Sequence, residues 1–526
     1  MSTPSAPKPT RRRMLSQTLQ IGATLGVASS SGLALQSHAA GRAKNKDVSA
    51  KGMSVEEAAK RLPELAAQLQ KATGIPGLAW AVVRANQTIA AQGIGVCETG
   101  HSAPVNADTV FQLASVSKPL GATVVARQIG EGKVTWNSRM QELLPWFTLR
   151  NPGSAALLTV GDLYAHRSGL PDHAGDKLEE LGYGQREVLE RLRYLPVKPL
   201  GQEYAYTNAG LTAAAISVAQ AAGTDWANLS QQTLYAPLGM SRTTSVYAQF
   251  MQQTNRATSH IRANDGSWKP VTPRNADPQS PAGGASSSVN DMALWLRLLL
   301  AQGRWQGQQL VATAALEQAW QPQAPGGHYG FGFNVGATGD GLKFISHSGA
   351  FMLGAATCFM LVPSRDAAIV VLTNGIPLGI PETLCRQFVD LIEQGRLTQD
   401  WWRLYSEGIA PLMAPTGALL NQKASSSPAP SGPLQRYVGT YDNVYYGPLQ
   451  ISIVNGALQL SLGPNAQSYS LAHWNGEQFW FTPGNESAAP NSISLAVFEA
   501  GKTGSTHSIW LEFYDDEGQG LFTRRS

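Results

Sequence analysis

The stretch of sequence that decides the fold reads Phe111-Gln112-Leu113-Ala114-Ser115-Val116-Ser117-Lys118. Its core is Ser-x-x-Lys, and a helical pattern follows it to about Gly130. Residues i and i+3 share one face of a helix, so the Lys118 amine is expected beside the Ser115 hydroxyl. Unpaired N–H groups and a positive dipole at a helix start favour an oxyanion and lower the pKa of a nearby lysine. The stretch suits a serine nucleophile, although four residues alone also fit an ordinary helix start with a solvated lysine.

A second motif, Tyr206-Thr207-Asn208, follows about 90 residues later and precedes a helical run from Leu211. A serine hydroxyl needs a base to remove its proton and a pair of donors to hold the oxyanion. Lys118 can be that base only if it is neutral. As a cation it would instead favour the phenolate of Tyr206, which could then act as the base. Asn208 could hold the lysine and a substrate carbonyl, but Tyr-x-Asn alone also fits a simple helix cap.

A third motif, His347-Ser348-Gly349, is expected at the end of a strand that starts near Lys343. A glycine at this point allows a substrate backbone to approach the strand edge. The N–H of Ala350 could pair with that of Ser115 as an oxyanion hole. Taken alone, a histidine at the end of a strand also fits a packed or solvated residue.

In this order and setting the three motifs resemble those of the penicillin-recognising serine hydrolases. Two further landmarks are similar, His166-Arg167-Ser168-Gly169-Leu170-Pro171 and Pro281-Ala282-Gly283-Gly284. The resemblance covers about residues 50–395. It is to the branch that contains class C β-lactamases, D,D-peptidases, D-aminopeptidases and esterases.

This resemblance implies an α/β (α+β) fold, in which an antiparallel sheet is flanked by helices and joined by an all-helical region. It implies that Ser115 is the acylated nucleophile and that Lys118 and Tyr206 share the proton transfers. It also implies that Asn208 positions these groups. The N–H groups of Ser115 and Ala350 would form the oxyanion hole beside Gly349.

One motif departs from the usual pattern. β-Lactamases and D,D-carboxypeptidases usually carry Lys-Thr-Gly where this chain has His347-Ser348-Gly349. Histidine is largely neutral at pH 7, so a substrate carboxylate would be held less strongly, by about 1–2 kcal/mol. Within the family, His-x-Gly is similar to what aminopeptidases and esterases show.

The sequence therefore predicts a serine hydrolase that forms an acyl-enzyme on amide or ester bonds of small peptide-like substrates, as a D-aminopeptidase or related peptidase does. A carboxylesterase is one alternative, and a slow β-lactamase or penicillin-binding sensor is another. No cofactor is expected. Oligomerisation stays open.

The chain of 526 residues is too long for one ordinary domain. Residues 1–39 contain Arg11-Arg12-Arg13, a mildly apolar run and Ser37-His38-Ala39, the order of a twin-arginine-like secretory signal. A retained membrane anchor is the alternative. We expect a periplasmic or secreted protein without a membrane span once the signal is removed. The predicted domains are the serine hydrolase at 48–412, a linker at 413–433 and a β domain at 434–526.

Charge and cysteine content narrow the choice of partners. The segment 1–39 holds four of the 40 basic residues and no acidic ones, so 36 basic residues remain against 36 acidic. This balance gives no reason to expect nucleic-acid binding. Cys97, Cys358 and Cys385 lie in apolar contexts without ligand-like spacing, so we expect no metal site and no disulfide framework, although one disulfide would be possible.

Local patterns place the elements around these motifs. Ser54-Val55-Glu56-Glu57 is a capping box for a helix that ends near Gly74. Both ends of the hydrolase region read as strands, with helices between them, which predicts one antiparallel sheet closed by both ends of the chain. The expected strands are 77–83, 88–96, 343–347, 354–361 and 367–372, and a helix is expected at about 382–393.

Beyond the linker, short alternating runs predict a small β-barrel of about eight strands. It resembles the lipocalin-like barrels appended to some members of the family. We expect an interior filled by Trp474, Phe479, Trp480 and Phe481 rather than a ligand cavity. Tyr445-Tyr446-Gly447 reads as a turn that could reach the active site.

Overall fold

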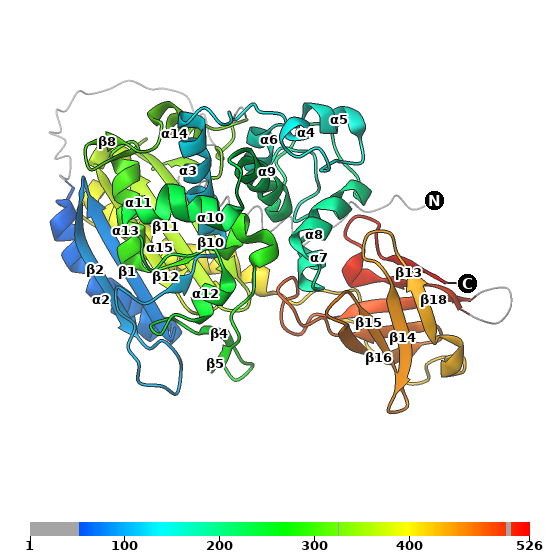
Figure 1. Cartoon of the computed structure of the whole chain (residues 1–526). Coiled ribbons are helices and arrows are strands. Elements are labelled where there is room, and N and C mark those ends of the chain that lie inside the picture. Colours follow the sequence, from blue (N-terminus) through cyan, green and yellow to red (C-terminus); the bar gives the residue numbers. More distant parts are fainter. Residues whose placement is uncertain (1–51, 325, 501–505, 526) are drawn as a thin grey trace, which may run out of the picture.

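The structure is a computed structural model and describes residues 52–324, 326–500 and 506–525. The predicted signal at 1–39 lies outside the described residues. The remainder forms a mixed α/β body and a closed β-barrel that lie side by side (Figure 1). The fold class predicted from the sequence is confirmed.

A six-stranded antiparallel sheet lies at the centre of the body, in the order β2-β1-β12-β11-β10-β9. Both ends of the hydrolase region supply strands to it, as predicted, and β9 was not foreseen. The run 343–347 was predicted too short, because the strand continues to Phe351 and carries Gly349 and Ala350 inside it. The strand bounds are β1 Gly77–Arg84, β2 Gln87–Gly95, β9 Asn334–Ala337, β10 Lys343–Phe351, β11 Ala355–Val362 and β12 Ala367–Thr373.

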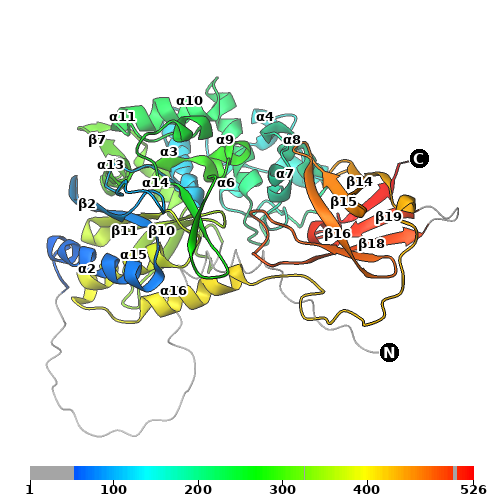
Figure 2. The same ribbon diagram turned by 90° about the horizontal axis from the view of Figure 1, so that it is seen from below.

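Helices cover both faces of this sheet. On one face lie α2 (Val55–Thr73) and α15 (Ile380–Gln394), whose apolar side chains share a buried cluster with Trp80 and Cys358. The Ser54 capping box starts α2, and Gly74 ends it in a left-handed conformation at φ 66°, as the sequence predicted. On the opposite face lies α13 (Val289–Leu300), where Trp295 packs edge-on against Phe359 at 5.0 Å. Figure 2 shows α2 and α15 together below the sheet.

The helical region between residues 117 and 320 packs against the α13 face and holds most of the remaining helices. Short strand pairs join its loops: β3 (Phe111–Gln112) with β6 (Ser286–Ser287), β4 (Ser259–Arg262) with β5 (Trp268–Val271), and β7 (Arg304–Trp305) with β8 (Gln308–Gln309). The helices are α3 Ser117–Gly130, α4 Met140–Leu143, α5 Pro152–Leu157, α6 Val160–Tyr164, α7 Asp176–Glu180, α8 Gln185–Arg191, α9 Asn208–Ala221, α10 Trp226–Ser230, α11 Ala236–Leu238, α12 Tyr247–Met251 and α14 Thr313–Ala319.

The C-terminal strands close into an eight-stranded antiparallel barrel. Phe479 and Phe481 are buried inside it, as predicted, but Trp474 and Trp480 are only half-buried. Successive side chains of a strand point to opposite faces, so Trp480, between Phe479 and Phe481, faces outward, whereas Trp474 lies at a bulge of its strand. The strands are β13 Gly439–Asp442, β14 Leu449–Val454, β15 Ala457–Leu462, β16 Gln467–Asn475, β17 Gln478–Phe481, β18 Ser494–Ala500, β19 Thr506–Leu511 and β20 Leu521–Arg524.

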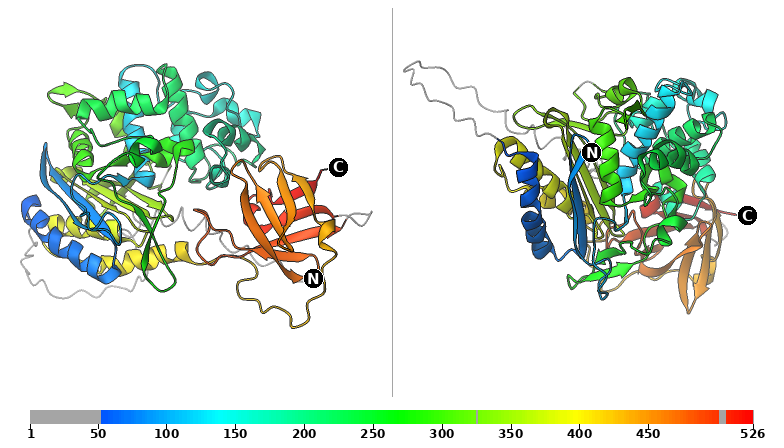
Figure 3. Two further views of the ribbon diagram at one scale, coloured as in Figure 1. Left: turned by 60° about the horizontal axis from the view of Figure 1, so that its bottom comes forward. Right: turned by 60° about the vertical axis from the view of Figure 1, so that its left-hand side comes forward.

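The barrel is connected to the body through α16 (Trp401–Ile409) and the segment that follows it (Figures 2 and 3). It also packs against the α7–α8 part of the helical region. The hydroxyl of Tyr183 donates to the carbonyl of Tyr446 at 2.7 Å, and that of Tyr445 accepts the N–H of Gly175 at 3.1 Å. The 445–447 turn therefore docks on the helical region and does not line the active-site cavity described below. Other barrel segments do.

Candidate active site

Ser115 lies in a tight 3-10 turn, Ala114–Val116, and α3 begins two residues later. The residue before it, Ala114, has φ +46°, a left-handed conformation that costs a residue with a Cβ about 1–2 kcal/mol. The Ser117 hydroxyl stabilises the turn, since it donates to the Ala114 carbonyl at 2.7 Å and accepts the Ala285 N–H at 3.0 Å. Ser115 is thus held on a strained turn that is hydrogen-bonded to the segment around Ala285.

Lys118 is fully buried and has three oxygen neighbours. Its Nζ lies 3.0 Å from the Ser115 Oγ, 2.7 Å from the Asn208 Oδ1 and 2.8 Å from the Ala282 carbonyl oxygen. Burial holds its pKa well below the usual value, Asp176 opposes this shift, and Arg274 adds to it. A neutral amine has two N–H donors and one lone pair. Asn208 and Ala282 can accept the two N–H groups, which leaves the lone pair for the Ser115 hydroxyl.

Tyr206 contacts the same serine oxygen from the other side. Its hydroxyl donates to the Ser115 Oγ at 2.7 Å, and its ring centre lies 4.5 Å from the Lys118 Nζ. Burial raises the pKa of Tyr206, and the hydrogen bond to Ser115 offsets only part of that rise. The resting site therefore favours a protonated Tyr206, whereas the sequence alone had left a phenolate open.

Loop residues fix the segment that carries Tyr206 and Asn208. The N–H of Tyr206 donates to the Asp172 Oδ1 at 2.7 Å, and that of Thr207 donates to the His166 Nδ1 at 3.2 Å. The His166 ring also packs on the Tyr206 ring at 4.5 Å. The motif 166–171 thus acts here through the placement of the tyrosine.

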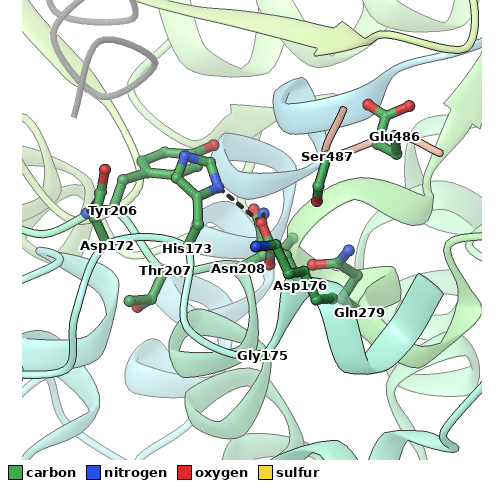
Figure 4. A network of polar contacts seen from close by, with 12 residues as sticks. Asp172, His173, Gly175, Asp176, Tyr206, Thr207, Asn208, Gln279, Glu486 and Ser487 are labelled. Atoms are coloured by element: carbon green, nitrogen blue, oxygen red, sulfur yellow. Dashed lines mark hydrogen bonds and ion pairs between the residues drawn. The ribbon is translucent and has the colours of Figure 1, made fainter. Parts of the chain in front are cut away.

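A polar network behind Asn208 was not foreseen. The Asn208 Nδ2 donates to the Asp176 Oδ2 at 3.0 Å, and the same oxygen pairs with the His173 Nδ1 at 2.7 Å. Figure 4 shows Asp176 between His173 and Asn208, with Ser487 and Glu486 approaching from the barrel. This network orients Asn208 so that its amide oxygen faces Lys118. Neither His173 nor Asp176 stands in a motif that the sequence analysis recognised.

His347 and Gly349 lie on the β10 segment next to Ser115. The His347 Nε2 is 3.1 Å from the Tyr329 hydroxyl, and burial lowers the pKa of His347 to about 3, with Lys118 as a second cause. A Cβ added to Gly349 would lie 2.3 Å from the Leu113 carbonyl oxygen and 2.9 Å from the Ser115 nitrogen. Glycine therefore lets β10 approach the serine turn and brings together the two segments whose N–H groups, at Ser115 and Ala350, were expected to form an oxyanion hole.

A cavity of about 670 Å³ opens at Ser115 and extends between the body and the barrel. Its body side includes Ser115, Tyr206, Asn208, Ser348 and Ala350. The segment after α16, which the sequence suggested was only a linker, also lines it, and the barrel supplies the β17–β18 loop and the turn after β19. These contributions are Pro415, Thr416, Gly417, Leu420, Asn421, Pro483, Glu486, Ser487, Ser492, Ile493, Glu512, Phe513 and Asp516.

Glu486 connects the barrel loop to the end of β10. Its carboxylate accepts the N–H groups of Met352 at 2.7 Å and Leu353 at 3.0 Å, just after β10 ends. It also pairs with Arg274 at 3.4 Å, and Arg274 forms a second ion pair with Glu179. Three charged side chains from the body and the barrel, Glu486, Arg274 and Glu179, thus meet in one buried cluster.

Other features of the described chain bear on the predictions. Within the described ranges, no group of three or more His, Cys, Asp or Glu side chains is arranged to hold a metal ion. Nor does any helix in those ranges have the length and apolar character needed to cross a membrane. Cys97, Cys358 and Cys385 are buried and unpaired.

Comparison with known proteins agrees with this geometry. The Beta-lactamase family model matches residues 62–389, and one described as Domain of unknown function (DUF3471) matches residues 423–521. The unguisins hydrolase ungD of Aspergillus violaceofuscus is 29% identical over 43% of this chain and 42% of its own length, so the match spans less than half of that relative. The D-alanyl-D-alanine-carboxypeptidase/endopeptidase AmpH of Escherichia coli is 24% identical over 44% of this chain and 60% of its own.

Solved structures show the same fold. The octameric penicillin-binding protein homologue from Pyrococcus abyssi superposes with a TM-score of 0.57 at 17% identity, and the match covers 88% of this chain and all of that one. The family match alone extends over more than half of the sequence. The chain belongs to the Beta-lactamase family of serine hydrolases, which includes peptidases and esterases.

Proposed function

We propose that this protein is a serine peptidase that cleaves amide or ester bonds of small peptide-like substrates through an acyl-enzyme. The observation that carries the proposal is that Ser115, which lines the cavity between body and barrel, has its Oγ within hydrogen-bond distance of both Lys118 Nζ and Tyr206 OH. A D-aminopeptidase or a related peptidase fits this description best. The name of one relative, the D-alanyl-D-alanine-carboxypeptidase/endopeptidase AmpH of Escherichia coli, supports it.

The proposed reaction begins when neutral Lys118 takes the proton of the Ser115 hydroxyl as the oxygen attacks the substrate carbonyl. The N–H groups of Ser115 and Ala350 hold the oxyanion. The tetrahedral intermediate then collapses, the leaving group takes the proton of Tyr206, and Lys118 returns its proton to the tyrosine. Water hydrolyses the ester through the same groups and restores the serine.

The charges in the cavity disfavour substrates that bear a carboxylate. The pKa of about 3 keeps His347 neutral at pH 7. The two cationic side chains that line the cavity are already paired, Lys177 with Asp516 and Arg274 with Glu179 and Glu486. β-Lactams carry such a carboxylate, so slow turnover of β-lactams is expected.

Export to the periplasm or the medium is part of the proposal and depends on the twin-arginine-like segment at 1–39. Fractionation of cells that express the full chain, followed by sequencing of the mature N-terminus, tests it. Replacement of Arg11-Arg12-Arg13 by lysines should leave the protein in the cytoplasm. Equal export of both forms would remove this part of the proposal.

A substrate panel on wild type and Ser115→Ala tests the enzymatic proposal. The panel contains D- and L-aminoacyl anilides, short p-nitrophenyl esters and nitrocefin, with mass spectrometry to detect an acyl group on Ser115. Anilide cleavage that disappears in Ser115→Ala supports the peptidase. Cleavage of esters alone favours the carboxylesterase, and a stable adduct with nitrocefin favours the penicillin-binding sensor. Activity that survives in Ser115→Ala would refute the mechanism.

A further inference from the structure

The cavity beside Ser115 has an excess of carboxyl groups. Two cationic side chains line it, against six acidic ones: Asp176, Glu180, Glu382, Glu486, Glu512 and Asp516. Most of the acidic groups already have donors within the protein. Glu512, for example, accepts the N–H groups of Ala418 at 2.8 Å and Leu495 at 2.9 Å, and Asp516 pairs with Lys177 at 2.6 Å.

Glu382 is different because no cation compensates it. It lies in the first turn of α15, is 7% exposed and forms no ion pair within the described part of the chain. Arg386, one helical turn further on, points instead to Asp390 at 3.8 Å and stacks 4.4 Å over the Trp401 ring. Burial raises the pKa of Glu382 to about 7, and its own backbone and the Ser348 side chain offset only part of that rise.

Two buried polar atoms at this end of the cavity lack a partner. The Glu382 Oε2 makes no hydrogen bond, and neither does the hydroxyl of Tyr405, which is 3% exposed and comes from α16. Both residues line the cavity. Each buried polar atom without a hydrogen bond costs about 1–3 kcal/mol of stability. A ligand group that bonds to both atoms would therefore gain binding free energy from each.

The strand register explains why this place belongs to the substrate site. His347 pairs with Phe359, which faces α13, and Ser348 pairs with Cys358, which faces α15. Ser348 therefore connects the catalytic strand to Glu382. It precedes Ala350 by two residues, a distance of about 7 Å along a strand. A side-chain amine can span such a distance from a carbonyl held at the oxyanion hole.

We propose that Glu382 and Tyr405 form a subsite for a primary ammonium group at the end of a substrate side chain, as in lysine-type amides. The ammonium supplies the counter-ion that Glu382 lacks and donates to the Tyr405 oxygen. This inference rests on the proposed function, because the ammonium belongs to the substrate that Ser115 cleaves. Glu180 also has an unpartnered oxygen, but Arg274 already compensates its charge.

The test compares two p-nitroanilides that differ only in this charge, lysine and Nε-acetyl-lysine anilide, each in D and L form and each with the α-amine either free or acetylated. Wild type should cleave the charged member with a kcat/KM at least tenfold higher. Glu382→Gln should remove the preference by lowering kcat/KM for the charged anilide alone, and Tyr405→Phe should reduce it several-fold. Glu393→Gln, a buried glutamate on the same helix outside the cavity, should keep it.

Other results would overturn the subsite. Equal rates for the charged and the neutral anilide in wild type would mean that the space beside Glu382 and Tyr405 holds only water. A preference that persists in Glu382→Gln, or that follows an α-ammonium instead, would assign the charge elsewhere. If Glu382→Gln does not fold, inhibition of neutral-ester hydrolysis in wild type decides, since pentylammonium should inhibit at least tenfold better than pentanol. Absence of any cleavage that depends on Ser115 would instead reject the proposed function itself.

Discussion

Tyr206 and Lys118 both form hydrogen bonds with the hydroxyl of Ser115. The amine has two acceptors besides the serine, so its lone pair is directed at the proton to be removed. The phenol donates to the oxygen that is about to attack. Because burial favours the neutral form of both groups, the pair is ready to move a proton without first having to shed a charge.

Tyr206→Phe tests this arrangement. The variant keeps the ring that packs on His166 but cannot deliver a proton to the leaving group. We expect kcat to fall about 10²–10³-fold for anilides with little change in KM. Esters, whose leaving groups need less protonation, should lose less. Tyr204→Phe, a neighbouring tyrosine without a bond to Ser115, is the matched control. An unchanged kcat in Tyr206→Phe would remove it from the proton transfer.

The rate should also depend on pH through Lys118. Its pKa is lowered, so the free base is present near neutrality, and activity should fall as acid protonates the amine. The acid limb of kcat/KM for a neutral ester reports this group. Asp176 raises the pKa of Lys118, so Asp176→Asn should move the limb to lower pH, and Asp225→Asn, a helix N-cap that does not shift the pKa of Lys118, should not. If the acid limb of Asp176→Asn stays at the wild-type pH, a group other than Lys118 causes the loss of activity.

Glu382 makes stability depend on pH. Its folded pKa of about 7 lies above the ordinary value of 4.5, so its contribution to stability is full below pH 4.5 and is lost as the pH rises through 7. A shift of this size corresponds to about 3 kcal/mol. Relative to Glu382→Gln, wild type without substrate should therefore lose about that much between pH 4.5 and pH 8. Urea unfolding of both proteins at several pH values measures it. If the free energies of unfolding of the two proteins change in parallel with pH, the raised pKa of Glu382 is contradicted.

At the scale of elements, the approach of β10 to the serine turn depends on one missing side chain. Gly349 does not have a positive φ, so the constraint is purely steric: a methyl group there would lie 2.4 Å from the Thr357 Oγ1 as well as against the Leu113 carbonyl. The Thr357 hydroxyl donates to that carbonyl at 2.7 Å and holds the turn to the sheet. An added methyl must push strand and turn apart.

Gly349→Ala should consequently lower kcat by at least tenfold, because the N–H groups of Ser115 and Ala350 would no longer converge on one oxygen. We expect stability to fall by about 1–3 kcal/mol, as overpacking does. Gly339→Ala is the control, since a Cβ there meets nothing within 4 Å. Both effects are read from ester kinetics and thermal unfolding. Wild-type kinetics in Gly349→Ala would show that the two segments need not touch.

Much of this arrangement could be predicted from local signals. The Ser54 capping box, the sheet strands from both ends of the chain and the alternation in the barrel each have a short-range physical cause, and the first two motifs contain the residues that meet at the Ser115 hydroxyl. Asp176, Glu382 and Glu486 could not be found in this way. Each is an ordinary acidic residue locally, and its environment is created by segments distant in the sequence, such as Ser348 for Glu382. Burial, which sets their charge state, is a property of the packed molecule.

At the scale of the whole molecule, the barrel acts as a wall of the active site. Its loop carries Glu486 to the end of β10, where the carboxylate replaces water for two N–H groups. A buried ion pair gives little net stability, but its rupture costs about 3–5 kcal/mol because one charge stays buried and unpaired. The contact of Glu486 therefore serves mainly to hold the barrel in a fixed position against the body.

Glu486→Ala should weaken this attachment of the barrel to the body. We expect a lower kcat/KM and a loss of selectivity among small substrates, because the cavity becomes more exposed to solvent. Calorimetry should show barrel and body unfolding in separate transitions, where wild type shows closer coupling. Glu499→Ala, on an outer position of β18, is the matched barrel control. A variant with unchanged selectivity and a single transition would show that the barrel is not part of the site.

The barrel wall of the cavity comes late in the sequence, and this position has a consequence for folding during translation. The turn that contains Glu512, Phe513 and Asp516 is made about 100 residues after residue 412, whereas the groups around Ser115 are complete by that residue. At about 5–20 residues per second, the 114 residues from 413 to 526 take roughly 6–23 s to add. During that interval on the ribosome, a folded body would hold its nucleophile in an open groove. The barrel segments thus complete the wall of a site whose other groups were made well before them.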